Sequence, residues 1–177
     1  MRKIKLLIAI LIICFTASAQ DATSYNSWNF AGGITGTPGH MVKVGYDVSP
    51  TNNLSYYFEA AGEWSNYNKM RYSSYSLSLG PRFYLIGGND LSNPKKINLL
   101  AGITGILQYE NETTLYKGLA FTKHLNYGAG AHLLAEYIYD PTIGIMGGFE
   151  QRLLFNKDLG KSNYNFFMGL RIHFGNN

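Results

Sequence analysis

The feature that most constrains the fold of this chain is a strict alternation of apolar and polar positions. It is clearest in the C-terminal stretch "NYNFFMGLRIHFGNN" (163–177). From Tyr164 to Phe174 every second residue is apolar, and Arg171 and His173 lie between them. Successive side chains of a β-strand point to opposite faces of the sheet. One face of this predicted strand is therefore apolar along its whole length, and the other face carries charge.

Other runs along the chain repeat this alternation. The clear ones cover 74–85, 125–137 and 143–153, and the weaker ones cover 28–36, 41–48, 53–64 and 97–109. Together with the terminal run they give eight candidate strands. The segments between them are dense in Gly, Pro, Asn, Asp and Ser, the residues that close hairpins. No segment is long enough to separate two domains, so we predict one domain of consecutive antiparallel strands.

The first 19 residues have the organisation of a Sec-type signal peptide. A basic "MRKIK" precedes the apolar "LLIAILIICF", and Ala17-Ser18-Ala19 supplies a small-residue cleavage site. The apolar run is too short to cross a bilayer core of about 30 Å as a helix. We therefore expect export and cleavage after Ala19.

Composition narrows the class of protein further. Cleavage removes Arg2, Lys3 and Lys5 and leaves 12 basic against 11 acidic residues, so we expect no direct nucleic-acid binding. The single cysteine, Cys14, lies in the signal peptide, which excludes disulfides and thiol chemistry from the mature chain. The 20 glycines and 14 tyrosines all follow residue 19, and so much Gly and Tyr is typical of a β-rich envelope protein.

Two architectures accommodate alternating strands: a soluble sandwich or barrel with an apolar core, and a transmembrane barrel with an apolar exterior. The polar face favours the second, because it carries few charges, of both signs, among Gly, Ser and Asn. These charged residues are Lys43, Glu59, Glu63, Arg82, Glu136, Glu150, Arg152, Arg171 and His173. Paired charges satisfy one another where bulk water is scarce. We predict that they form a charge network in a narrow lumen.

Aromatic residues near the strand ends support a membrane location, because aromatic girdles mark both membrane interfaces. They are Trp28, Tyr46, Trp64, Tyr109, Tyr139, Phe155, Tyr164 and Phe174. Lipid also requires closure, since an open sheet edge would leave backbone groups unpaired in hydrocarbon. We therefore predict an all-β fold, an eight-stranded antiparallel up-and-down transmembrane β-barrel in a Gram-negative outer membrane. Residues 20–27 would form a short N-terminal segment and 28–177 the barrel; a soluble periplasmic β-domain is the alternative.

The connectors then sort by hairpin parity. With both termini in the periplasm, the connectors at 37–40, 65–72, 110–124 and 155–162 are extracellular. The longest, 110–124, sets apolar residues among charges, and a loop that served solubility alone would not need them. The residues are Leu115, Tyr116, Leu119 and Phe121, and they are the candidate partner surface.

Catalysis and cofactors find little support in the sequence. The histidines, His40, His124, His132 and His173, are not at metal-ligand spacing, so we expect neither a metal nor another cofactor. A lipid-modifying enzyme would need a His/Ser or His/acid pair on the lipid face, and the clear strands show none there. The charged set could also form an ion path, but the interior of eight strands is just wide enough for side chains to fill. We predict structural packing and no enzyme activity.

Three C-terminal stretches, "NYGAGAHLLAEYI", "GFEQRLLF" and "FFMGLRIHF", resemble the TraO family of conjugative transposon proteins. The signal peptide, the length and the Tyr/Gly-rich middle also agree with that family. The resemblance implies a small outer-membrane component of a DNA-transfer apparatus, with other transfer proteins as partners and no catalytic residues. A general surface barrel for adhesion or envelope integrity is the alternative function, and a lipid-modifying outer-membrane enzyme is a further one.

The terminal strand also resembles the C-terminal signal that the barrel-assembly machinery reads. Gly169, Ile172 and Phe174 carry this resemblance. Two departures are Phe167, where a polar residue is usual, and the trailing "GNN" after the last aromatic. The expected partners are therefore the assembly machinery and the lipid of the outer membrane.

Overall fold

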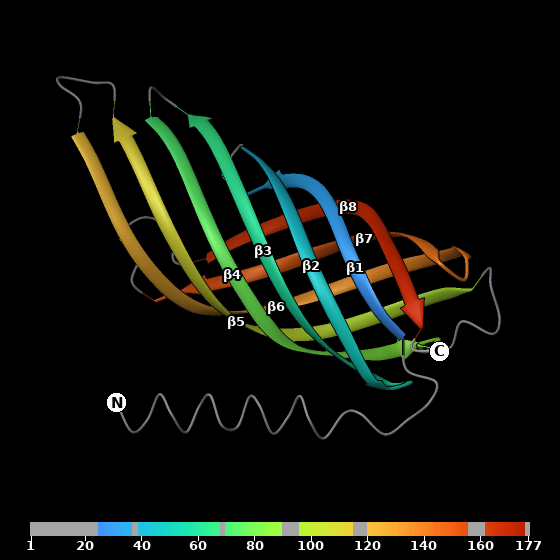
Figure 1. The fold of residues 1–177 in the computed structure, drawn as a ribbon. Helices are drawn as coiled ribbons and strands as arrows, with labels where there is room; N and C mark the ends of the chain where they lie inside the picture. Colours follow the sequence, from blue (N-terminus) through green and yellow to red (C-terminus); the bar gives the residue numbers. More distant parts are fainter. Residues whose placement is uncertain are drawn as a thin grey trace, which may run out of the picture.

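The computed structural model describes residues 25–36, 39–67, 70–89, 96–114, 120–155 and 162–175. The strands are β1 (Tyr25–Thr35), β2 (Gly39–Thr51), β3 (Leu54–Tyr67), β4 (Met70–Ile86), β5 (Ile97–Thr114), β6 (Ala120–Asp140), β7 (Ile143–Leu154) and β8 (Ser162–Gly175). Each pairs antiparallel with the next, and β8 pairs with β1 to close the barrel (Figure 1). In the described part of the chain, no helix is long and apolar enough to cross a membrane.

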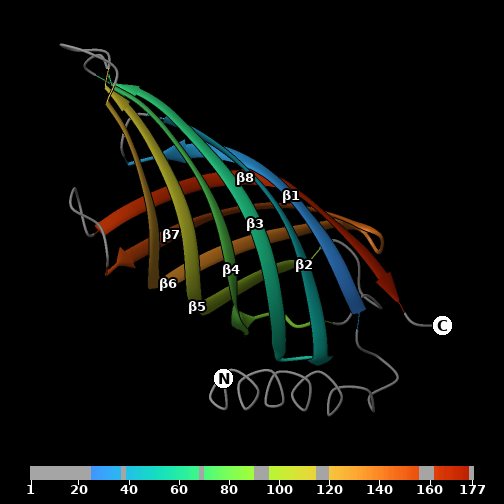
Figure 2. The ribbon, with the colours of Figure 1, turned by 60° about the vertical axis from the view of Figure 1, so that its left-hand side comes forward.

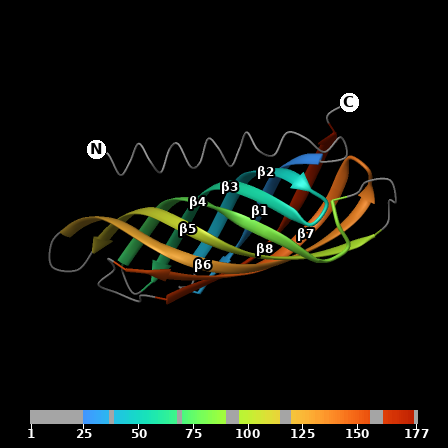
Figure 3. The same ribbon diagram turned by 90° about the horizontal axis from the view of Figure 1, so that it is seen from below.

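The predicted fold class is confirmed, and all eight strands occur in the expected order. The strands are tilted relative to the barrel axis, as the view from below shows (Figure 3). Closure leaves no sheet edge along the band that faces lipid, where an unpaired backbone group would cost several kcal/mol.

Three predicted boundaries are wrong, because the strands continue into segments assigned to connectors. β1 begins at Tyr25, inside the predicted N-terminal segment 20–27. Most of 65–72 belongs to β3 and β4, and most of 110–124 belongs to β5 and β6. These segments do not alternate apolar and polar residues regularly, so they lack the pattern used to find strands. Beyond the lipid the outer face of a strand meets water, and pairing no longer requires an apolar face.

The two faces of the sheet differ sharply in exposure. On the outer face Phe166 is 49% and Leu170 is 50% exposed, whereas Asn165 and Arg171 on the inner face are buried. At the end that holds the termini, Trp28 packs against Tyr46 with ring centroids 4.9 Å apart, and Tyr46 stacks on Phe174 at 6.1 Å. A continuous apolar outer surface with aromatic residues at its border is stable against lipid and unstable against water.

The two ends of the barrel are unequal. Short turns at Asn52-Asn53 and Pro141-Thr142 close hairpins at the end that holds the termini. At the other end β3, β4, β5 and β6 project beyond the remaining strands (Figures 1 and 2). The register agrees, because β2 pairs with β3 only up to Ser65 and β7 pairs with β6 only from Gly128 onward. Outer-membrane barrels have short periplasmic turns and longer extracellular parts, so we assign the projection to the extracellular side.

We call this projection the four-stranded extension: residues 65–67 of β3, 70–74 of β4, 110–114 of β5 and 120–126 of β6. It replaces the long loop that the sequence suggested. Leu115, Tyr116 and Leu119 of the candidate partner surface lie outside the described residues. Phe121 lies in β6 and not in a loop, since it pairs with Thr113 of β5.

The orientation of the faces gives a first prediction. Phe166→Asp places a carboxylate in the lipid-facing surface, and we expect it to lower the free energy of unfolding by roughly 1–3 kcal/mol, somewhat less than basic residues cost there. The matched variant is Asn165→Asp, one residue away on the inner face, and it should cost clearly less. Urea unfolding in lipid vesicles, followed by heat-modifiable gel migration, measures both. Equal costs would contradict the assignment of the faces.

Candidate functional site

The barrel interior is the most densely charged region of the molecule. The structure places all nine predicted lumen residues inside the barrel, and none is more than 5% exposed. They are Lys43, Glu59, Glu63, Arg82, Glu136, Glu150, Arg152, Arg171 and His173. Because the inner face of every strand alternates with its lipid-facing positions, residues far apart in sequence meet across the lumen.

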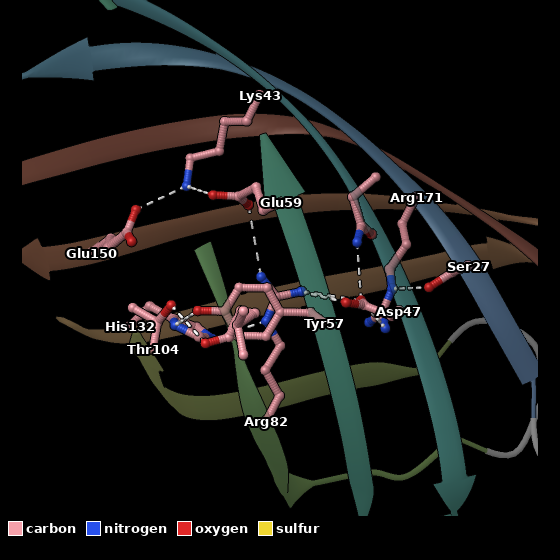
Figure 4. Close-up of polar contacts among 12 residues, drawn as sticks. Ser27, Lys43, Asp47, Tyr57, Glu59, Arg82, Thr104, His132, Glu150 and Arg171 are labelled. Carbon is pink, nitrogen blue, oxygen red and sulfur yellow. Dashed lines mark hydrogen bonds and ion pairs between the residues drawn. The ribbon is translucent and has the colours of Figure 1, made fainter. Parts of the chain in front are cut away.

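The first group of contacts lies toward the extracellular end. Arg152 donates hydrogen bonds to Glu63 at 2.5 Å and to Glu150 at 2.9 Å. The Lys43 ammonium lies between two acids, 3.0 Å from Glu150 and 2.8 Å from Glu59 (Figure 4). It also lies 4.0 Å from the centroid of the Phe167 ring, a cation–π arrangement. Each of these cations is therefore held between carboxylates and has little freedom to move.

The second group is centred on Asp47, which the sequence analysis did not select. Arg82 Nη1 donates to both Asp47 carboxylate oxygens, at 2.9 and 3.0 Å. Arg171 Nη2 donates to Asp47 at 2.7 Å, and the Asn29 amide donates at 3.0 Å (Figure 4). The position of Asp47 could have been predicted from the spacing. Asp47 lies four residues after Lys43 in the same alternating run, so both side chains point to the inner face.

Arg171 extends this group toward the periplasmic end. Its Nη1 donates to Glu136 at 3.1 Å, and its Nε donates to the Ser27 hydroxyl at 2.8 Å. His173 Nε2 lies 2.7 Å from the other Glu136 oxygen. One guanidinium thus joins β1, β2 and β6 through hydrogen bonds to Ser27, Asp47 and Glu136, a fork geometry that Arg provides and Lys does not.

The two groups meet where Arg82 Nη2 lies 3.8 Å from Glu59. The result is one chain of ion pairs along the lumen, which we call the charge ladder. In order from the extracellular end it comprises Glu63, Arg152, Glu150, Lys43, Glu59, Arg82, Asp47, Arg171, Glu136 and His173. Acidic and basic residues alternate at every step, so each buried charge is flanked by opposite charge.

Arg82 has a further partner in His132. Its Nε donates to His132 Nε2 at 2.9 Å, and because a guanidinium Nε–H only donates, that imidazole nitrogen must accept. The hydrogen of the neutral ring is then on Nδ1, which donates to the Tyr57 hydroxyl at 3.2 Å. The Arg82 guanidinium also stacks 3.8 Å from the centroid of the Tyr57 ring. His132 and Tyr57 therefore orient Arg82 without adding charge.

Apolar side chains fill part of the remaining interior. Met41, Leu100, Leu134, Met146 and Phe167 form a buried cluster inside the barrel. Among the described residues no three His, Cys, Asp or Glu side chains are placed to hold a metal ion. Fixed ion pairs and packed apolar groups thus occupy much of the described interior.

The inner face of the four-stranded extension holds polar contacts of its own. The Tyr72 hydroxyl donates to Glu110 at 2.7 Å, and the Gln108 amide donates to the Tyr72 hydroxyl at 2.9 Å. The inner face therefore stays polar from the ladder up to the extension.

The predicted assembly-signal residues all lie in β8. Ile172 is 41% exposed, and Phe174 stacks against Tyr46 on the outer face. Gly169 lies on the inner face, where a Cβ would collide with the backbone of Phe30 and Ala31 in β1. Close approach of β8 to β1 thus requires a glycine here; recognition of these residues by the assembly machinery stays a prediction.

Comparison with known proteins identifies the architecture. No family model and no curated protein matches the sequence. Neisserial surface protein A matches the structure with a TM-score of 0.66 and 12% identity, over 85% of this chain and 97% of that one. The fold is that of a small outer-membrane β-barrel. Together with the apolar exterior, it places the protein in the outer membrane; the predicted signal peptide, 1–19, lies outside the described residues.

Two further outer-membrane β-barrels have the same fold. The outer membrane protein OprG from Pseudomonas aeruginosa matches with a TM-score of 0.59 and 10% identity, over 90% of this chain and 99% of that one. Ail, the attachment invasion locus protein of Yersinia pestis, matches with a TM-score of 0.56 and 11% identity, over 88% and 100%. At these identities the likeness concerns the fold.

The charge ladder gives a second prediction. Asp47→Asn keeps the size of the side chain but leaves the buried guanidinium groups of Arg82 and Arg171 without their shared carboxylate. We expect the free energy of unfolding to fall by about 3–5 kcal/mol, the cost of breaking a buried ion pair from one side. Urea unfolding in lipid vesicles measures the change. Asp140→Asn, at an exposed turn, is the control and should stay within about 0.5 kcal/mol; a similar small effect at Asp47 would contradict the central role of that residue.

Proposed function

We propose that the protein is a non-conducting, non-catalytic outer-membrane barrel that supports the four-stranded extension at the cell surface as a binding platform. The observation that carries this proposal is the charge ladder, which spans the lumen with paired charges. A barrel with a filled interior has its outer surface and its ends available for function. Of these, the extension is the part that the other strands do not need for closure.

The absence of catalysis is part of this proposal. His40 and Ser73 lie on the outer face near the extracellular border, where a lipid-modifying site would be expected. Both pair with Trp64, from opposite sides, so two strand spacings of about 4.8 Å each separate them. A hydroxyl nucleophile and its base must approach to about 3 Å, and the Trp64 strand lies between them.

The resemblance of the C-terminal stretches to the TraO family favours a conjugative DNA-transfer apparatus as the setting. In that setting the barrel would act as an adaptor, with the extension bound to another transfer protein. The near-neutral mature chain, and the burial of most of the charged side chains that the structure describes, favour a protein partner over DNA.

Attachment is the second candidate function. It is favoured by the fold shared with Ail, an attachment protein by its description, and by the one-sided surface projection. Both functions use the same extension, so one variant tests them together.

The filled lumen gives a third prediction. Purified protein in a planar bilayer should produce no stable conductance steps, because the paired charges of the ladder and the apolar cluster would block ions. An open porin treated identically is the positive control. Reproducible steps that scale with the amount of protein would contradict the proposed function.

Shortening the extension gives a fourth prediction. Asn111 pairs with Lys123, so replacing residues 112–122 by Asn-Gly closes the β5–β6 hairpin with a two-residue turn. We expect the variant barrel to assemble and to migrate as a heat-modifiable species. DNA transfer from the host carrying the native gene cluster should fall at least tenfold if the protein is a transfer adaptor, and attachment to host cells should fall if it is an adhesin. Unchanged transfer and attachment would contradict the platform.

A further inference from the structure

A hollow of about 500 Å³ lies on the outer surface across β2, β3, β4 and β5. Its floor is formed by Ala60 and Gly62 of β3. Val42 and Val44 of β2 line one side, and the large side chains of β4 and β5 line the other: Tyr75, Leu77, Leu107 and Tyr109. The volume is within the range of about 300–1,000 Å³ that is typical of ligand sites.

The hollow follows from the sequence of β3. Ala60 pairs with Val44 on one side and with Leu77 on the other, so a small residue lies between two larger ones. Gly62 likewise lies between two larger residues, Val42 and Tyr75. The Trp64 indole folds over Gly62 and lies 3.1 Å from the position that a Cβ would occupy there. The result is a narrow apolar trough on the lipid-facing surface, partly covered at its extracellular end by an aromatic ring.

Polar groups lie directly beyond that end. Ser73 pairs with Trp64 on one side and with Asn111 on the other, and Arg71 follows one row further out, paired with Asn66. Arg71 is exposed. The Asn111 side-chain oxygen is buried, and no described residue donates a hydrogen bond to it. A cation and an unsatisfied acceptor thus lie next to an apolar trough.

The described acidic side chains lie away from this end of the trough. Of the carboxylates whose side chains the structure describes, all except Asp140 are buried inside the barrel. Asp140 lies at the opposite end, beside the Pro141-Thr142 turn. On the described outer surface, therefore, no acid lies beside the exposed Arg71 guanidinium, a group that can bind an anion.

We propose that the trough binds an acyl chain of a phosphorylated glycolipid from the outer leaflet, with Arg71 binding the phosphate and the Asn111 oxygen accepting a hydrogen bond from a sugar hydroxyl. An acyl chain fits the apolar floor and walls. A phosphate fits an exposed guanidinium, and a sugar hydroxyl can donate to the Asn111 oxygen, to which no described side chain donates. This lipid site does not require the proposed function, because an acyl chain and a phosphate can bind the trough and Arg71 whether or not a surface partner binds the rest of the extension.

The experiment uses Trp64 as its own reporter. The chain has two tryptophans, so Trp28→Phe leaves Trp64, which covers the trough, as the only one. The Trp28→Phe full-length protein is refolded in detergent micelles and titrated with purified diphosphoryl lipid A, with its chemically dephosphorylated form, and with phosphatidylglycerol. We expect a saturable change in Trp64 emission, with diphosphoryl lipid A bound at least tenfold more tightly than phosphatidylglycerol.

Two variants in this background separate the acyl and phosphate contacts. Ala60→Leu fills the floor and should weaken binding of both forms of lipid A at least tenfold. Arg71→Gln should weaken binding of the diphosphoryl form about tenfold and leave the dephosphorylated form unchanged. Ala129→Leu makes the same apolar change on the outer face of β6, outside the residues that line the trough, and should bind like the parent.

The proposal is overturned if Ala60→Leu binds like the parent, if Arg71→Gln has no effect on the diphosphoryl form, or if phosphatidylglycerol binds equally well. The last outcome would indicate a general affinity for anionic lipid. Heat-modifiable gel migration checks that each variant is folded. Failure of these tests would leave the platform proposal standing, because the conductance and transfer assays test it without any change in the trough.

Discussion

Hydrocarbon offers no hydrogen-bond partner to a backbone N–H or C=O group, and the rest of this structure depends on that constraint. It requires the eight strands to close on themselves, with β8 paired to β1. Closure of so few strands leaves an interior just wide enough for side chains. Residues alternate between the two faces of each strand, and the outer positions are apolar because they meet lipid. The charged residues of the membrane-spanning part therefore point into the narrow lumen. Pairing at every step of the charge ladder is the consequence of closure.

The ladder in turn decides where function can occur. Asp47 accepts hydrogen bonds from two guanidinium groups, and Lys43 lies between two carboxylates, so each of them bridges strands that do not pair with one another. Such a network holds the barrel cross-section fixed, since any opening would leave buried charges without partners. A rigid wall is a good support for the projecting strands, and it confines recognition to the outer surface and the ends.

Much of this follows from the sequence, and the exceptions have physical reasons. The alternation predicts that Leu170 faces lipid and that Arg171 faces the lumen, because a charged side chain is unfavourable against hydrocarbon. It does not reveal that Asp47 is the hub of the ladder, since which inner residues meet depends on the register around the barrel. It also fails in the four-stranded extension, where Asn66 on the outer face and Glu110 on the buried inner face are both polar, because the outer face no longer meets lipid there. The sequence therefore predicts which face of each membrane-spanning strand meets lipid. It does not predict the contacts across the lumen or the strands that continue beyond the lipid.

The extension and the trough share their strands, and this has a mechanical consequence. β3, β4 and β5 carry Gly62, Tyr75 and Tyr109 around the trough and then continue without interruption into the extension. A lipid chain in the trough would contact the base of the same strands that a surface partner contacts further out. Because paired strands bend together and not singly, occupancy of the trough would limit the tilt of the extension relative to the membrane. With lipid bound, the small residues of β3 would thus link the lipid around the barrel to the geometry of its exposed surface.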